Sequence, residues 1–330
     1  MQLEFSRLRS AIFGALEAEQ DGTWFRFFRF TARQRAIYRD KYPEFYTKTL
    51  GSAGIRLDLE TDAEELSLDY RIRKASSRNW YSFDGYVNGV LTTHLQGSVE
   101  TEPEGNFRIL LPQGTHRVTV YLPCLSAAEL SNLTLKSGTV FRPFIPQRRL
   151  LCLGDSITHG YDATYPSFAY PNLLAAAWNA EVVNQGIGGE RFNADALDPD
   201  LNYQPNLITV AYGTNDWSHG SQTYFSDTEQ YLEQLHRSFP NTPTAVILPI
   251  WRADAQRITP VGTFEEARRF LQNTAEKYAN IRVIDGLTLT PHLPEFYSDR
   301  YLHPNDIGFQ IYAANLLRQL KKYFSMETYL

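Results

Sequence analysis

The chain has 330 residues, of which 43% are hydrophobic and 21% are charged, and this balance excludes a disordered protein. A formal net charge of −5 gives no general attraction to nucleic acid or to anionic membranes, so neither is an expected partner. The length exceeds one typical domain of roughly 100–200 residues and therefore predicts two domains.

The two cysteines, Cys124 and Cys152, lie in apolar surroundings and indicate neither a disulfide framework nor a metal site. The N-terminal segment MQLEFSRLRS contains no continuous apolar stretch, and the chain has no apolar run of about 18 residues. We therefore expect a cytoplasmic protein.

In the first part of the chain, apolar residues tend to alternate with polar ones, as in strands that bury one face. The alternation is clearest in residues 55–59, 66–72 and 118–122. Asn88-Gly89 has the chemistry of a tight hairpin turn, and residues 31–41 could form a short helix or a turn. We therefore predict an antiparallel, jelly-roll-like β-sandwich over residues 1–145.

In the second part, residues 146–330, short continuous apolar runs alternate with longer amphipathic segments. Thr263 and Glu266 form a capping box at the start of one predicted helix. Strands that are apolar on both faces and separated by helices indicate a parallel, doubly wound sheet, so we predict an α/β domain. The expected strands cover residues 150–153, 181–184, 207–211, 244–249 and 281–285.

Small and polar residues follow the first three of these strands. They are Gly154-Asp155-Ser156, residues 184–189 (NQGIGG) and Gly213-Thr214-Asn215-Asp216. Functional residues of parallel sheets gather at the carboxyl ends of the strands, so the three clusters should meet at one edge. Residues 299–306 (DRYLHPND) precede the last helix and bring His303 to the same edge. Together these segments supply a hydroxyl, a base and several hydrogen-bond donors.

The four segments, in this order and spacing, resemble the sequence blocks of the SGNH hydrolases, also called the GDSL esterase and lipase family. The resemblance covers residue 150 to the C-terminus and implies a flavodoxin-like three-layer fold. Ser156 would be the nucleophile and His303 its base, because a serine hydroxyl reacts only when a near-neutral base accepts its proton. The resemblance assigns the oxyanion hole to the backbone N–H groups of Ser156 and Gly189 and to the side-chain amide of Asn215. It implies no cofactor.

The match departs from the family at the acid that orients the histidine. The family has this acid three residues before the histidine, where this chain has Arg300, and Asp299 lies four residues before His303. A loop bulge could absorb the shift and make Asp299 the third member of a triad. A Ser–His dyad assisted by a backbone carbonyl is the alternative. Asp306 is expected to cap the last helix.

Other residues have structural interpretations beside functional ones. His159 lies near Ser156 in the sequence, but we expect its ring to line the pocket or to face solvent. The glycine run in residues 186–189 follows the second strand, which disfavours a dinucleotide site. Aromatic residues near strand ends could form either substrate walls or core, and a cluster in the first domain could be either a sugar-binding platform or an inner sheet face. The first group is Tyr212, Trp217 and Trp251, and the second is Trp80, Tyr81, Phe83 and Tyr86.

We predict a serine esterase that hydrolyses short acyl esters, with acetyl groups on a carbohydrate as the expected substrate. The β-sandwich ahead of the catalytic blocks resembles the architecture of two-domain bacterial carbohydrate esterases. The alternatives are a lipase or thioesterase for longer acyl chains, and an inactive carbohydrate-binding protein. The sequence leaves a homo-oligomer open.

Overall fold

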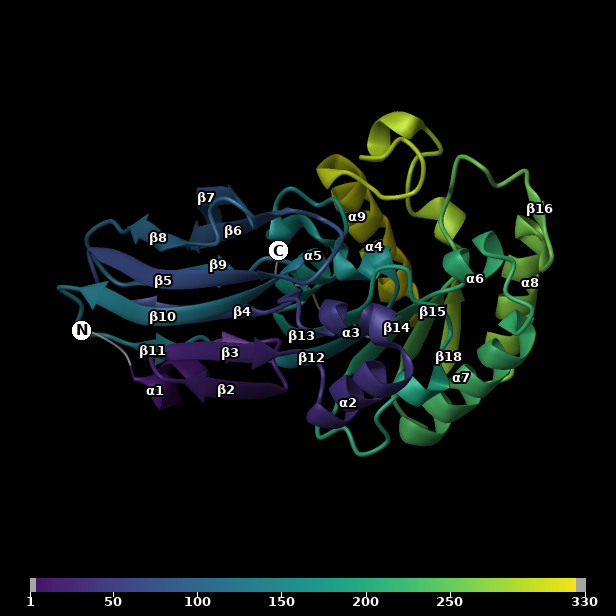
Figure 1. Ribbon diagram of the computed structural model, residues 1–330, viewed down its shortest axis with the longest axis horizontal. Helices are drawn as coiled ribbons and strands as arrows, with labels where there is room; N and C mark the ends of the chain where they lie inside the picture. Colours follow the sequence, from purple (N-terminus) through teal and green to yellow (C-terminus); the bar gives the residue numbers. More distant parts are fainter. Residues whose placement is uncertain (1–3, 325–330) are drawn as a thin grey trace.

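The computed structural model describes residues 4–324 and contains two antiparallel sheets followed by one parallel sheet. The antiparallel sheets lie face to face in the left part of Figure 1, and the parallel sheet with its helices forms the right part. One antiparallel sheet has the order β1-β4-β9-β6-β7 with β11 on β4, and the other β2-β3-β10-β5-β8. The N-terminal strands are β1 (Ile12–Phe13), β2 (Glu17–Asp21), β3 (Trp24–Phe28), β4 (Arg56–Thr61), β5 (Glu65–Lys74), β6 (Trp80–Val87), β7 (Val90–Ser98), β8 (Glu104–Leu110), β9 (His116–Tyr121), β10 (Ser126–Lys136) and β11 (Arg142–Pro143).

The parallel sheet has the order β13-β12-β14-β15-β18. The second strand along the chain lies at one edge beside the first, which is the flavodoxin-like arrangement. Its strands are β12 (Arg148–Gly154), β13 (Ala180–Gly186), β14 (Leu207–Ala211), β15 (Thr244–Ile247) and β18 (Ile281–Ile284), and a small hairpin joins β16 (Ile258–Thr259) to β17 (Gly262–Thr263). The sequence-based prediction of a β-sandwich followed by a parallel α/β sheet is confirmed.

Helices cover both faces of the parallel sheet. α5 and α9 pack on one face with the core around Leu150 and Val182, and α7 and α8 pack on the other around Leu151 and Val183. This alternation along β12 and β13 explains why both strands are apolar throughout. The described helices are α1 (Phe5–Ser10), α2 (Ala32–Lys41), α3 (Pro43–Thr49), α4 (Ser156–His159), α5 (Tyr170–Ala177), α6 (Thr214–Ser218), α7 (Tyr224–Ser238), α8 (Phe264–Ala275) and α9 (Asp306–Tyr323), and short 3₁₀ turns are η1 (Pro166–Phe168), η2 (Ala194–Ala196), η3 (Gly286–Thr288) and η4 (Pro294–Phe296).

Three short sequence motifs form the local structures expected of them. Asn88 and Gly89 have positive φ angles, 50° and 81°, and join β6 to β7. Residues 31–41 form α2 with Thr31 as its N-cap, and the predicted capping box of Thr263 and Glu266 starts α8. Each of these features depends on contacts within a few residues.

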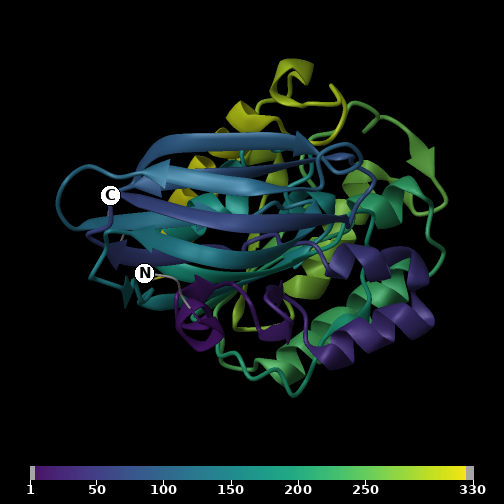
Figure 2. The same cartoon turned by 60° about the vertical axis from the view of Figure 1, so that its left-hand side comes forward.

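The two parts of the chain pack closely together. α2 and α3, which connect β3 to β4, project from the antiparallel sheets and lie against the C-terminal part in both views (Figures 1 and 2). Ala53, Cys124 and Leu125 belong to the same buried cluster as Leu150 and Val182. The boundary at residue 145 therefore stays a prediction, because the core continues across it.

Within residues 4–324, no helix is long and apolar enough to cross a membrane. The described part of the chain also contains no group of three or more His, Cys, Asp or Glu side chains that could hold a metal ion.

Candidate active site

The nucleophile candidate Ser156 lies where β12 ends and α4 begins. A Cβ atom at Gly154 would stand 2.1 Å from the side-chain oxygen of Thr158, so only glycine permits this sharp turn. Asp155 is the N-cap of α4, and its side chain accepts a hydrogen bond of 3.0 Å from the Ile157 N–H. The turn leaves Ser156 only 4% exposed at the edge of the sheet.

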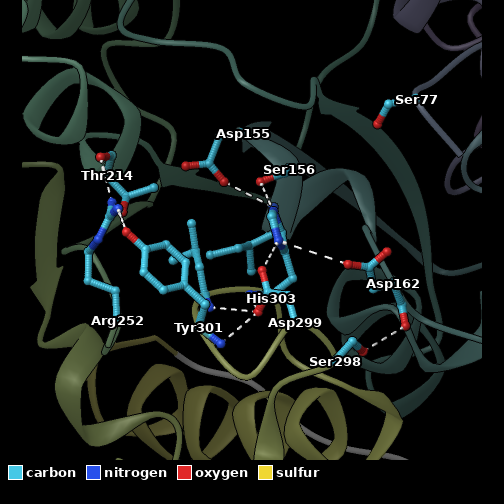
Figure 3. A network of polar contacts seen from close by, with 12 residues as sticks. Ser77, Asp155, Ser156, Asp162, Thr214, Arg252, Ser298, Asp299, Tyr301 and His303 are labelled. Atoms are coloured by element: carbon cyan, nitrogen blue, oxygen red, sulfur yellow. Dashed lines mark hydrogen bonds and ion pairs between the residues drawn. The ribbon is translucent and has the colours of Figure 1, made fainter. Parts of the chain in front are cut away.

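The structure brings Ser156, His303 and Asp299 into one hydrogen-bonded chain (Figure 3). His303 Nε2 lies 2.8 Å from the Ser156 hydroxyl oxygen, and His303 Nδ1 lies 2.7 Å from the Asp299 carboxylate. Because the carboxylate accepts a hydrogen bond from the Nδ1–H, Nε2 is free to accept the serine proton. The three side chains thus have the geometry of a nucleophile, its base and an orienting acid.

A backbone bulge accommodates the extra residue between the acid and the histidine. Arg300 has a φ of 56°, a left-handed conformation that few residues adopt. One Asp299 carboxylate oxygen then accepts the N–H groups of Tyr301, Leu302 and His303 at 2.8–3.1 Å. Partial burial opposes ionisation, but the hydrogen bonds from His303 and from backbone N–H groups hold the pKa of Asp299 well below its usual range. The acid is therefore ionised when the histidine is neutral.

The predicted oxyanion donors lie on neighbouring loops. Gly189 has a φ of 84°, and its N–H donates to no acceptor within the described residues. Asn215 lies in the first turn of α6, where its side-chain amide donates one hydrogen bond of 2.9 Å to the Glu190 carbonyl. An amide nitrogen carries a second N–H, which remains for a ligand. The Ser156 N–H lies at the N-terminus of α4, where backbone donors lack helical partners.

Arg252 joins two of the site segments and was not found from the sequence. Its guanidinium donates to the Thr214 carbonyl at 3.0 Å and to the Tyr301 hydroxyl at 3.1 Å (Figure 3). Arg252 therefore ties the loop before Asn215 to the loop that carries His303. Its position three residues after Pro249, where the predicted strand 244–249 ends, was the one signal in the sequence.

Asp162 is a second carboxylate near the imidazole, also missed by the sequence analysis. Its carboxylate lies 3.9 Å from His303 Nδ1, beyond hydrogen-bonding distance. Arg78 from the N-terminal part holds it through two hydrogen bonds of 2.6 and 2.8 Å. The N-terminal part thus reaches the rim of the active site at Arg78.

The expectation for His159 is wrong. The side chain is fully buried, and the ring lies 3.1 Å from the Cys124 carbonyl and 3.2 Å from the Arg29 guanidinium. Burial, together with the positive charge of Arg29, lowers the pKa of His159 well below its ordinary value. The ring therefore does not face solvent. Its Nδ1 accepts a hydrogen bond from the Gly188 N–H, so the ring helps to hold the loop that carries Gly189.

Several residues for which the sequence left a functional role open have structural roles instead. Trp217 and Tyr212 are buried in the core, and Trp251 packs partly buried against Tyr297. Tyr81 and Phe83 lie inside the sandwich, so the first-domain aromatic cluster is no exposed platform. The cap of α9 is Asn305, and the Asp306 carboxylate instead accepts the N–H of Thr164, which corrects the expected capping role of Asp306.

Three buried carboxyl groups surround the site. Burial raises the pKa of Asp155 to about 6, that of Asp216 to about 7 and that of Glu190 to about 8. Glu190 directly follows Gly189, so its neutral form at neutral pH places no negative charge beside the predicted oxyanion hole.

Comparisons with known proteins agree with this arrangement. Residues 152–311 match the GDSL-like Lipase/Acylhydrolase family. An acetylxylan esterase / glucomannan deacetylase of Cellvibrio japonicus (strain Ueda107) is 24% identical over 322 residues, which cover 83% of this chain and 84% of that protein.

Solved structures share the fold over most of the chain. A salicylyl-acyltransferase from a tetracycline biosynthetic pathway has a TM-score of 0.77 at 20% identity and covers 94% of both chains. A family two carbohydrate esterase from Cellvibrio japonicus has a TM-score of 0.61 at 18% identity, covering 93% of this chain and 96% of its own. The match of residues 152–311 to the GDSL-like lipase/acylhydrolase family includes Ser156, His303 and Asp299, and the protein is a carboxylic ester hydrolase.

Proposed function

We propose that the protein is a serine esterase that removes short acyl groups, acetyl above all, from a carbohydrate. The observation that carries the proposal is the continuous hydrogen-bonded chain from Asp299 through His303 to Ser156. The deacetylase activity named for the Cellvibrio japonicus relative supports the acetylated carbohydrate as substrate. The bulge at Arg300 argues against the inactive binding protein, because it restores the acid to the imidazole.

The first half of the proposed reaction transfers the acyl group to the enzyme. The Ser156 oxygen attacks the ester carbonyl carbon while its proton moves to His303 Nε2. The carbonyl oxygen becomes an anion that the N–H groups of Ser156, Gly189 and Asn215 stabilise, at about 3 kcal/mol for each donor. The carbon–oxygen bond to the sugar then breaks, and the sugar oxygen takes the proton from His303.

The second half releases the acid. His303 takes a proton from a water molecule, whose oxygen attacks the acyl-enzyme carbonyl carbon. The bond to the Ser156 oxygen breaks, the serine regains its proton from His303, and acetic acid leaves. Asp299 remains ionised throughout and stabilises the imidazolium that forms in each half.

The test measures hydrolysis of 4-nitrophenyl acetate and of 4-nitrophenyl palmitate, together with acetate release from acetylated xylan and glucomannan oligosaccharides. We expect the acetate ester to react much faster than the long-chain ester. The Ser156→Ala and His303→Ala variants should each lose activity by about 10³-fold or more. A fluorophosphonate should label the wild type at Ser156.

Faster hydrolysis of the palmitate ester would overturn the short-acyl assignment and favour a lipase or thioesterase. Full activity in the folded Ser156→Ala variant would overturn the mechanism itself. Absence of acetate release from every acetylated oligosaccharide would remove the carbohydrate from the proposal.

A further inference from the structure

Two basic side chains of the N-terminal part reach the loop that carries Gly189. Arg29 follows β3 directly, and Lys48 lies in α3, the helix that packs on residues 184–190. Neither side chain forms an ion pair with a carboxylate in the described part of the chain. Both instead donate hydrogen bonds to backbone carbonyls, so their charges act on the backbone of this loop.

Arg29 fixes the base of the loop. The side chain is fully buried and donates to the carbonyls of Asn184 at 2.6 Å and Gly186 at 2.7 Å. The same guanidinium also donates to the carbonyls of Lys48 at 2.7 Å and Gly51 at 2.8 Å. Arg29 therefore joins the end of β13 to the end of α3 and sets where Lys48 lies relative to the loop.

Lys48 acts on a single peptide group. Its ammonium nitrogen lies 2.6 Å from the Gly188 carbonyl oxygen. That carbonyl belongs to the same planar peptide unit as the Gly189 N–H, and in a trans peptide the two groups point in opposite directions. A cation that holds the carbonyl therefore also fixes the direction of the N–H, and polarisation of the peptide group makes that N–H a stronger donor.

The surroundings leave room for this role. Gly189 has a positive φ of 84°, and a Cβ atom there would lie 3.6 Å from Phe45 and 3.8 Å from the Lys48 ammonium. The Lys48 ammonium also lies 4.9 Å from the centre of the Phe45 ring, which holds the end of the side chain in place. The positive charge thus lies close to the backbone donor that the oxyanion would meet.

We propose that Lys48 is a positioning residue for the oxyanion hole, which orients and polarises the Gly189 N–H through the Gly188 carbonyl. The inference rests on the proposed function, because it requires Gly189 to donate to the oxyanion. It implies that the β-sandwich part completes the catalytic machinery of the C-terminal half. An oxyanion exists only in the transition state and the intermediates, so Lys48 affects kcat rather than substrate binding.

The experiment compares Lys48→Met and Lys48→Arg in the full chain, with 4-nitrophenyl acetate as substrate. Methionine keeps the stem against Phe45 but removes the charge and the donors, whereas arginine keeps both. We expect Lys48→Met to lower kcat by about 10–100-fold with KM within about threefold of wild type. Lys48→Arg should recover at least half of that loss on a logarithmic scale. Lys41→Met is the matched control. Lys41 ends α2 and also reaches the C-terminal part, where it pairs with Asp195 at 2.8 Å, but it does not contact the loop that carries Gly189, so kcat should stay unchanged.

Thermal unfolding is measured for every variant, so that a loss of kcat counts only for folded protein. A kcat of Lys48→Met within threefold of wild type would overturn the proposal. The same holds if arginine restores nothing in a folded variant, or if the change falls on KM alone. Failure of the proposed function is recognised separately, because folded Ser156→Ala would then remain active and the wild type would not be labelled by fluorophosphonate.

Discussion

The two sides of the active site are held in place by different means. On the imidazole side, the position of His303 is fixed by a residue of the same loop, because the Asp299 carboxylate accepts hydrogen bonds from three backbone N–H groups of residues 301–303 and from the imidazole. On the oxyanion side, residues 184–190 are held by Arg29 and Lys48, which lie 155 and 140 residues away from their partners in the chain. One side is a local motif, and the other is an interface between the two parts of the molecule.

This difference separates two kinds of mutational effect. A change at Asp299 should alter the chemistry and leave the fold intact, because the hydrogen bonds of its carboxylate all lie within residues 299–303. A change in the interface should alter stability as well as activity, because the same side chains join the two parts.

Asp299→Asn tests the local side. Asparagine keeps an oxygen that accepts the backbone N–H groups, but its NH₂ group cannot accept the His303 Nδ1–H. The imidazole should then take the tautomer in which Nε2 carries the proton and cannot act as a base. We expect kcat on 4-nitrophenyl acetate to fall by roughly 10²–10⁴-fold, while the free energy of unfolding changes by less than about 1 kcal/mol.

Asp162→Asn is the control for this variant, since Asp162 is the other carboxylate near His303 Nδ1. It lies 3.9 Å away and its oxygens are engaged by Arg78, so kcat should stay within about threefold of wild type. If Asp162→Asn lost more activity than Asp299→Asn, the acid of the triad would come from the residues after α4. The claim that residues 299–303 alone orient the imidazole would then be wrong.

The same difference explains how much the sequence predicted. The strand-end clusters and Ser156 could be found because parallel strands bring their carboxyl ends to one edge. Whether Asp299 pairs with His303 could not be decided, because an arginine at position 300 does not indicate the left-handed conformation that makes the pairing possible. Arg29 lies in the aromatic-rich segment WFRFFRF, and only the long-range packing of α3 on β13 decides that it is buried and charged.

Arg29→Met tests the interface side. The substitution leaves four buried carbonyls without the donors that joined β13 to α3. Burial lowers the pKa of Arg29 to about 9, so at neutral pH the lost group is a charged donor. We expect the free energy of unfolding in urea to fall by about 3–4 kcal/mol, with a loss of activity in the folded fraction.

Arg33→Met is the matched control for Arg29→Met. Arg33 belongs to α2 and pairs with Asp198 across the same interface, but half of its side chain is exposed. The buried Asp198 carboxylate keeps its hydrogen bonds from the Thr31 hydroxyl at 2.7 Å and the Asp200 N–H at 3.1 Å. Because only a half-exposed cation is lost, the loss should stay below about 1 kcal/mol. Equal losses in the two variants would show that burial of Arg29 is not what joins the two parts.

Glu190→Gln tests the interface side through pH. Burial raises the pKa of Glu190 to about 8, so the folded protein holds the carboxyl neutral while the unfolded chain ionises it above its ordinary pKa near 4.5. The stability that depends on the neutral form is fully present below the unfolded pKa and is lost as pH rises toward the folded pKa. Glutamine does not titrate. Between pH 5 and pH 8, the free energy of unfolding of Glu190→Gln should therefore rise by roughly 3–4 kcal/mol relative to that of the wild type.

The measurement is urea unfolding of both proteins at several pH values across this range. Glu44→Gln serves as the control, because Glu44 lies near the same loop on α3 but is exposed, and its difference from wild type should not change with pH. A constant difference between Glu190→Gln and wild type would mean that Glu190 is already ionised in the folded protein. A negative charge would then lie next to Gly189 at neutral pH, and the Lys48 ammonium would have to offset that charge before it could favour an oxyanion.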